Sequence, residues 1–219
     1  MNVLLFGMSG MVGQGVLREC LLDPDVKQVL SIGRNITGLQ HPKVREIAHA
    51  NMWNYDSIES DLAGIDACFF CLGVSSTGMS EAEYVRITHD ITLAAATRLA
   101  KLNTQMTFIY VSGAGTDSTE RGRVMWARVK GRTENDLLKL PFKAYMFRPG
   151  MIQPLHGIKS KTKAYRILYS LSKPLLPLLR AALPNQITTT EQMGRAMLGV
   201  AKRGCEKKVL ESREIGNVR

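Results

Sequence analysis

The chain begins with an apolar run that leads directly into glycines spaced three residues apart. Residues 3–6 read Val-Leu-Leu-Phe, and Gly7, Gly10 and Gly13 follow. Beyond them, apolar residues recur at the spacing of one helix face: Val12, Val16, Leu17, Cys20 and Leu21. Glycines let a backbone approach an anion closely, and a helix N-terminus offers unpaired N–H groups. The pattern therefore predicts a phosphate cradle for a dinucleotide; its structural alternative is a tight strand-to-helix turn.

Length and composition indicate an ordinary globular chain. The 219 residues are 45% hydrophobic, which allows one sizeable core. We expect one domain over 1–219, in which 151–219 form a C-terminal substrate-binding or lid-forming portion. The first apolar run has no basic stretch before it and is interrupted by glycines, which favours a buried strand over a signal peptide. Together with the lack of an apolar stretch of about 20 residues, this predicts a soluble protein of the cytoplasm.

Cysteines and histidines show no pattern typical of a metal site. Cys68 and Cys71 form a C-x-x-C motif, but they lie in an apolar run, 67–72, that reads as a strand. Residues three apart in a strand point to opposite faces, so this pair is not expected to bind zinc or to act in redox chemistry. The four histidines have no ligand spacing either, and we predict no metal.

Charge is distributed unevenly along the chain, whose formal net charge is +10. Residues 1–120 hold 8 Lys/Arg and 13 Asp/Glu, whereas residues 121–180 hold 14 and 2. A basic field of this kind suits an anionic cofactor, an acidic partner or a membrane surface. Nucleic acid is not expected, because only Tyr165 and Tyr169 accompany the basic stretch and no binding motif is present.

Strand and helix patterns alternate over the first 150 residues. Strands are predicted at 3–6, 26–32, 44–47, 66–72, 107–111 and 144–147. Helices are predicted from position 12 onward and over 81–102 and 124–140. This alternation predicts an α/β fold with a doubly wound, mostly parallel sheet of the Rossmann type.

The last third of the chain has a different pattern. Residues 159–183 are basic and leucine-rich, with prolines that break them into short helices. They suit a lid over a substrate pocket, or a peripheral membrane or protein contact. Thr189 is predicted to cap a helix that runs to Ala201, with Glu191 in its first turn, and 208–215 to form a late strand.

With these elements placed, the chain resembles the atypical short-chain dehydrogenase/reductases. Within them it is similar to the small proteins related to the Tat-interacting protein and to nucleoside-diphosphate-sugar epimerase-like proteins. The likeness covers almost the whole chain and rests on short motifs. These are 7–13, Gly33-Arg34, Cys71-Leu72-Gly73, Val111-Ser112-Gly113-Ala114, Val129-Lys130-Gly131 and Arg148-Pro149-Gly150.

The resemblance implies which residues contact a cofactor. It assigns Gly7, Gly10 and Gly13 to the pyrophosphate, together with the turn residues Ser9, Met11 and Val12. The adenosine side falls to Cys71, Leu72 and Gly73, and the nicotinamide side to Pro149, Gly150 and Met151. An alternative for the last group is that Arg-Pro-Gly only ends a strand.

The end of the second strand bears on which cofactor is bound. An acid there would accept hydrogen bonds from the ribose hydroxyls of NAD, but the residues are Gly33 and Arg34. A guanidinium suits a 2′-phosphate, so NADP(H) is favoured over NAD(H). The alternative is that Arg34 is only an exposed loop cation.

The catalytic pattern of the resembled family is incomplete in this chain. That family uses a Tyr-x-x-x-Lys pair, in which the phenol passes a proton and the lysine assists it and holds the nicotinamide ribose. Here Trp126 stands in the tyrosine position and Lys130 in the lysine position, while Ser112 matches the serine that orients a substrate carbonyl. An indole N–H donates a hydrogen bond but has no accessible acid–base pKa.

Two classes of function therefore remain open. One is an NADP(H)-dependent oxidoreductase or epimerase that acts on a small molecule, with another proton donor. The other is a catalytically impaired dinucleotide-binding sensor or interaction module. The sequence specifies neither the substrate nor the oligomeric state.

Overall fold

A seven-stranded parallel sheet organises the computed structural model, which describes residues 1–158 and 186–218. The strand order is β3-β2-β1-β4-β5-β6-β9, and every neighbouring pair is parallel. The strands are β1 Asn2–Phe6, β2 Gln28–Gly33, β3 Val44–Ala48, β4 Ala67–Phe70, β5 Thr107–Val111, β6 Lys143–Arg148 and β9 Val209–Glu211. The predicted parallel α/β sheet is confirmed.

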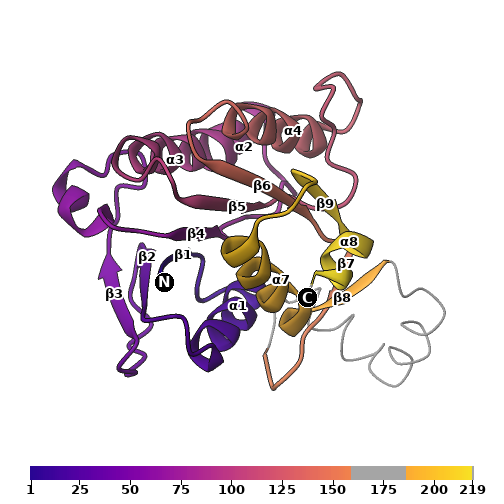
Figure 1. Cartoon of the computed structure of the whole chain (residues 1–219). Helices are drawn as coiled ribbons and strands as arrows, with labels where there is room; N and C mark the ends of the chain where they lie inside the picture. The colour runs from indigo at the N-terminus through magenta and orange to yellow at the C-terminus, as the bar shows by residue number, and fades with distance from the viewer. Residues whose placement is uncertain (159–185, 219) are drawn as a thin grey trace.

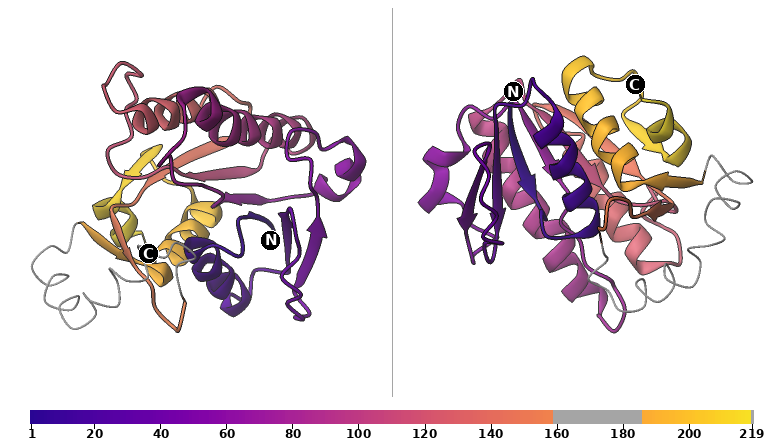
Figure 2. Two further views of the ribbon diagram at one scale, coloured as in Figure 1. Left: turned by 180° about the vertical axis from the view of Figure 1, so that it is seen from behind. Right: turned by 90° about the horizontal axis from the view of Figure 1, so that it is seen from below.

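Helices cover both faces of this sheet, as Figures 1 and 2 show. One face carries α1 (Met11–Leu22) and α7 (Thr190–Arg203). The other carries α2 (Glu81–Val85), the π-helical turn η2 (Arg86–Asp90), α3 (Ile91–Leu102) and α4 (Met125–Leu137). Parallel strands require such crossover helices, and buried sheet faces on both sides explain why the strands are apolar almost throughout.

The central strand β1 shows how the sequence supplies both cores. Val3 and Leu5 pack in the cluster beneath α1 and α7, whereas Leu4 and Phe6 pack in the cluster beneath α3 and α4. All four side chains are at most 1% exposed. Alternating side chains of a strand point to opposite faces, so one apolar run nucleates two cores.

Close contact between α1 and α7 depends on two glycines. A Cβ placed on Gly15 would lie 2.6 Å from both Cβ and the carbonyl oxygen of Thr190. A Cβ on Gly194 would lie 2.6 Å from Cγ of Glu19. The helix pair is thus packed backbone to backbone near the start of α7. Thr189 caps α7 as predicted, because its Oγ1 accepts a hydrogen bond from the Gln192 N–H at 3.0 Å.

Two of the predicted elements differ from the structure. The predicted helix over 81–102 is interrupted by η2, in which His89 lies between Asp90 and Asp136. The strand predicted over 208–215 is wrong in its second half, because it ends at Glu211 and α8 (Ser212–Asn217) follows. There Glu211 and Glu214 form a reciprocal capping box that starts a helix.

Two further strands were not predicted. These are β7 (Met151–Gln153) and β8 (Ile187–Thr189), which pair in parallel. The 3₁₀ helix η1 (Asp56–Leu62) was not predicted either. The segment 159–183, predicted as a lid or interfacial region, lies outside the described residues.

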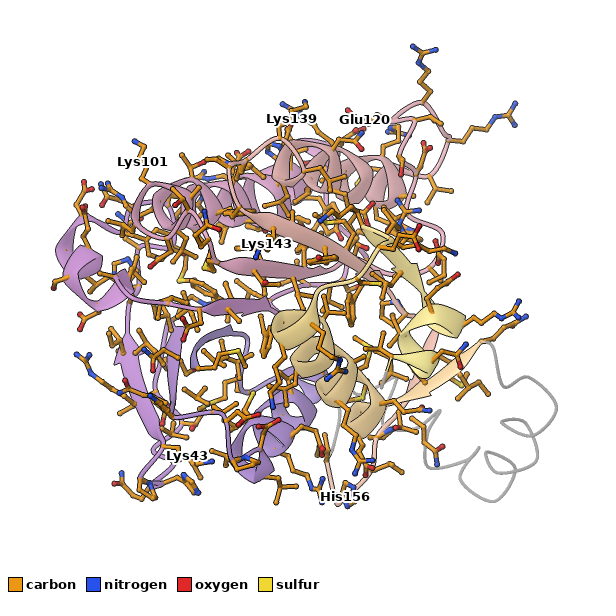
Figure 3. The ribbon with its side chains drawn as sticks, viewed as in Figure 1. Lys43, Lys101, Glu120, Lys139, Lys143 and His156 are labelled. Carbon is orange, nitrogen blue, oxygen red and sulfur yellow. The ribbon has the colours of Figure 1, made fainter. Side chains whose placement is uncertain are left out.

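Several charged side chains lie on the outer surface of the molecule, whereas Glu19 and Glu134 are buried. Figure 3 shows Lys101, Lys139 and Glu120 projecting from the side of the α2–α4 layer that faces away from the sheet. Within residues 1–158 and 186–218, no helix combines the length and the apolar character needed to span a bilayer.

Candidate functional site

The glycine turn joins β1 to the N-terminus of α1. Gly7 has a φ of +80°, and the Gly10 N–H donates to the Gly7 carbonyl at 2.9 Å. A Cβ on Gly13 would lie 2.1 Å from the Gly7 oxygen, so only glycine permits this turn. Gly10 is the N-cap of α1, no side chain caps this end, and its first turn holds no acidic residue. The first N–H groups and the positive end of the helix dipole are therefore available to an anion.

The loop after β4 lies against this turn. A Cβ on Gly7 would approach the carbonyl carbon of Cys71 to 2.7 Å and the nitrogen of Leu72 to 2.8 Å. Cys71 and Leu72 are thus brought next to the glycine turn, and Gly73 follows in open space. Cys68 packs on the α3 side of the sheet and Cys71 contacts the α1 side, so the two thiols point to opposite faces. Burial raises the pKa of both thiols, which keeps them protonated near neutral pH.

A cavity of about 430 Å³ opens beside the glycine turn. Its lining includes Gly7, Ser9, Gly33, Arg34 and Leu72. It therefore joins the carboxyl ends of β1 and β2 to the loop after β4, which is where dinucleotides bind in open α/β sheets. Arg34 is an exposed side chain of this lining.

The loop that carries Arg34 is folded around one carboxylate. Glu46 on β3 accepts hydrogen bonds from the N–H groups of Thr37, Gly38 and Leu39 at 2.7, 2.9 and 3.0 Å. It also accepts from the Thr37 hydroxyl at 3.1 Å. These donors stabilise the Glu46 carboxylate and fix the loop after Arg34, and Glu46 lines the same cavity as Arg34.

Lys130 lies on α4, and its ammonium group reaches the carboxyl end of β5. Its Nζ donates to the carbonyl oxygen of Ser112 at 2.5 Å and lies 5.8 Å from the ring centroid of Tyr110. Burial lowers the pKa of Lys130 to about 8, and the nearby Glu134 carboxylate opposes that shift. Trp126, one helical turn earlier, packs against the loop after β5: a Cβ on Gly115 would lie 3.5 Å from its ring. The structure thus brings Lys130 and Ser112 into contact and gives Trp126 a packing partner.

The Ser112 hydroxyl is already engaged in hydrogen bonds within the protein. It donates to Oε1 of Glu134 at 2.5 Å and lies 3.2 Å from the Phe147 carbonyl oxygen. Glu134 is 1% exposed and its carboxylate is paired with Arg148. In this geometry the hydroxyl predicted to orient a substrate is held by a buried acid.

The Arg-Pro-Gly segment ends β6 and is held at three points. Arg148 bonds to Glu134 and to Ser118, and it contacts Glu211 at 3.4 Å. The Pro149 carbonyl accepts from the Ala114 N–H at 2.9 Å, and the Gly150 N–H donates to Ser212 Oγ at 2.6 Å. Met151, 37% exposed, then begins β7. Pro149 therefore lies beside the loop after β5, while the arginine has a structural partner of its own.

Sequence reasoning missed Glu134. The available signal was its position four residues after Lys130, on the same face of α4. Because its neighbours Thr133 and Leu137 are buried, the Glu134 carboxylate needs hydrogen-bond donors within the protein. Only the folded chain shows that Ser112 and Arg148 are these donors.

Comparison with known proteins supports the fold and connects the chain to named relatives. No family model matches the sequence. The chain is 27% identical over 154 residues to Protein FMP52-2, mitochondrial, of Scheffersomyces stipitis, covering 69% of this chain and 66% of that protein. It is 29% identical over 167 residues to Protein FMP52, mitochondrial, of Saccharomyces cerevisiae, covering 74% and 69%. The match thus spans just under two thirds of the first relative's length.

Solved structures share the fold at low sequence identity. The Bordetella bronchiseptica enzyme WbmF in complex with NAD+ superposes with a TM-score of 0.68 at 16% identity, covering 98% of this chain and 76% of that one. UDP-N-acetylglucosamine 4-epimerase of Bacillus cereus gives 0.68 at 12% identity, covering 99% and 82%. The Rossmann-type fold of short-chain dehydrogenases and epimerases, predicted from the motifs, is confirmed.

The expected cytoplasmic location is contradicted by these relatives, which are named mitochondrial proteins. That expectation rested on a first apolar run that reads as a buried strand and on the lack of an apolar stretch of about 20 residues, and neither feature distinguishes the cytoplasm from a mitochondrion.

Proposed function

We propose that this chain binds a nicotinamide dinucleotide, NADP(H) in preference to NAD(H), in a site that lacks the usual proton relay of short-chain reductases. The observation that carries the proposal is a cavity of about 430 Å³ that joins Arg34 to the glycine turn, which leads directly into the uncapped N-terminus of α1. An anionic pyrophosphate suits the first, and a 2′-phosphate suits the guanidinium of the second. WbmF and WbmG, which share this fold, were solved with NAD bound.

At the nicotinamide end of the proposed site, Lys130 suits the cofactor, but Trp126 and Ser112 do not supply the proton that conventional reductase chemistry needs. A bound nicotinamide would supply a hydride, and Lys130 would hold its ribose. Carbonyl reduction also needs a proton donor poised near neutral pH. Trp126 offers none, and the Ser112 hydroxyl is held by Glu134. These groups favour a binding protein with little conventional reductase activity.

The alternative is an active oxidoreductase or epimerase on an unidentified small molecule. One observation favours it, because Lys130 has a pKa of about 8 and so carries a proton that can be transferred near neutral pH. Steady-state turnover distinguishes this alternative from the binding function.

Fluorescence titration with NADPH and NADH tests the cofactor assignment. A charge-assisted hydrogen bond contributes about 1.5–3 kcal/mol, so Arg34→Ala should weaken NADPH binding by about tenfold or more and change NADH binding little. Arg132→Ala, an exposed arginine on α4 outside the cavity lining, is the matched control. Equal wild-type affinities for the two cofactors, or an unchanged NADPH affinity in Arg34→Ala, would overturn the assignment.

A further inference from the structure

Glu134 joins elements that are far apart in sequence at the carboxyl edge of the sheet. It is 1% exposed and lies on α4 one turn after Lys130. Its Oε1 accepts from the Ser112 hydroxyl at 2.5 Å and from Nε of Arg148 at 3.0 Å. Its Oε2 accepts from the terminal guanidinium nitrogen of the same arginine. A buried carboxylate needs such donors, and here they come from the ends of β5 and β6.

The same serine connects Glu134 to Lys130. The Ser112 side chain is held by Glu134, and its backbone N–H donates to the Phe147 carbonyl at 2.9 Å. The Ser112 carbonyl in turn accepts from Lys130 Nζ at 2.5 Å. Fixing the hydroxyl therefore fixes the carbonyl that holds the ammonium group.

We propose that Glu134 is a positioning residue that sets the place and the charge of the Lys130 ammonium toward the cofactor, through Ser112 and with Arg148 as its counterion. The proposal rests on the proposed function, in which Lys130 contacts the nicotinamide ribose. Glu134 makes no contact with the cofactor in this assignment.

The charge of Glu134 gives the proposal a signature in pH. Burial holds the pKa of Lys130 near 8, and the Glu134 carboxylate keeps it from falling further. Because the ammonium is the form that donates to a ribose hydroxyl, NADPH affinity should fall as pH rises through about 8. Without the carboxylate, Lys130 should lose its proton at a lower pH.

Glu134→Gln is the test variant, and Glu19→Gln is its matched control. Glu19 is also a buried glutamate paired with an arginine, since it is 5% exposed and bonds Arg195, but it lies between α1 and α7 away from Lys130. NADPH affinity is titrated from about pH 7 to about pH 10, where the 2′-phosphate keeps its charge. We expect Glu134→Gln to bind about tenfold more weakly at pH 7.5 and to have its midpoint at lower pH. Glu19→Gln should match the wild type in both.

A second readout uses the protein without cofactor. The rate at which acetic anhydride labels Lys130 reports its neutral form, and peptide mass spectrometry measures it as a function of pH. Glu134→Gln should move this labelling profile to lower pH. An unchanged profile would overturn the proposal. A shifted profile in a protein that binds no NADPH would instead refute the proposed function and leave the positioning role intact.

Ser112→Ala keeps the inference testable if Glu134→Gln does not fold. It removes the link between the carboxylate and the serine but leaves both charges in place. NADPH affinity should fall in this variant too. Wild-type affinity in folded Ser112→Ala would contradict a positioning route through the serine.

Discussion

At the scale of single residues, Trp126 is the departure from the Tyr-x-x-x-Lys pattern that matters most for the chemistry of the site. In the resemblance to short-chain dehydrogenase/reductases it stands where a tyrosine would pass a proton, and it packs on the loop after β5 near Gly115. Lys130, one turn later, keeps a titratable ammonium close to the carboxyl end of β5. In the proposed function, cofactor binding and proton transfer are therefore separable.

Trp126→Tyr tests that separation. A positioned proton donor typically contributes 10²–10⁴-fold to such reactions, so NADPH oxidation with a panel of aldehydes, ketones and sugar nucleotides should rise above background in this variant. Trp126→Phe supplies a similar ring without the hydroxyl and should stay at the wild-type level. Robust NADPH oxidation by the unmodified protein, insensitive to Lys130→Ala, would show that catalysis uses other residues.

At the scale of elements, the α1–α7 contact limits what position 15 can hold. A Cβ on Gly15 meets backbone and side-chain atoms of Thr190 at 2.6 Å, so Gly15→Ala must push the helices apart. Overpacking of this kind costs about 1–3 kcal/mol of the free energy of unfolding, measured by urea denaturation. Gly216→Ala on α8, where nothing lies within 4 Å, is the control and should be neutral or slightly stabilising. Equal stability of the two variants would contradict the close packing.

The central elements were predictable because their signals are local. β5 was predicted with its observed bounds, 107–111, and the Thr189 cap of α7 was found from a single side chain. The missed elements depend on distant partners. β7 forms only because it pairs with β8. Their paired residues Met151 and Ile187 are 36 positions apart in the sequence. Glu134 on α4 likewise meets Ser112 and Arg148 only because the ends of β5 and β6 lie beside this helix in the folded chain.

At the scale of the whole molecule, the candidate site is a property of the sheet. Gly7, Arg34, Cys71, Ser112 and Arg148 each lie at or just after the carboxyl end of a strand: β1, β2, β4, β5 and β6. The parallel order aligns these ends along one edge, which is why residues up to 141 positions apart converge there. The sequence patterns placed the ends of these five strands to within two residues but gave no contact between them.

A crystal structure of the protein with NADPH tests the central claim most directly. The account predicts the pyrophosphate at the N-terminus of α1, the 2′-phosphate on Arg34 and the nicotinamide ribose on Lys130. It also predicts that the Ser112 hydroxyl stays on Glu134 rather than turning toward the nicotinamide. NADPH bound elsewhere, or bound here with its 2′-phosphate remote from Arg34 and Lys130 turned away, would contradict the account.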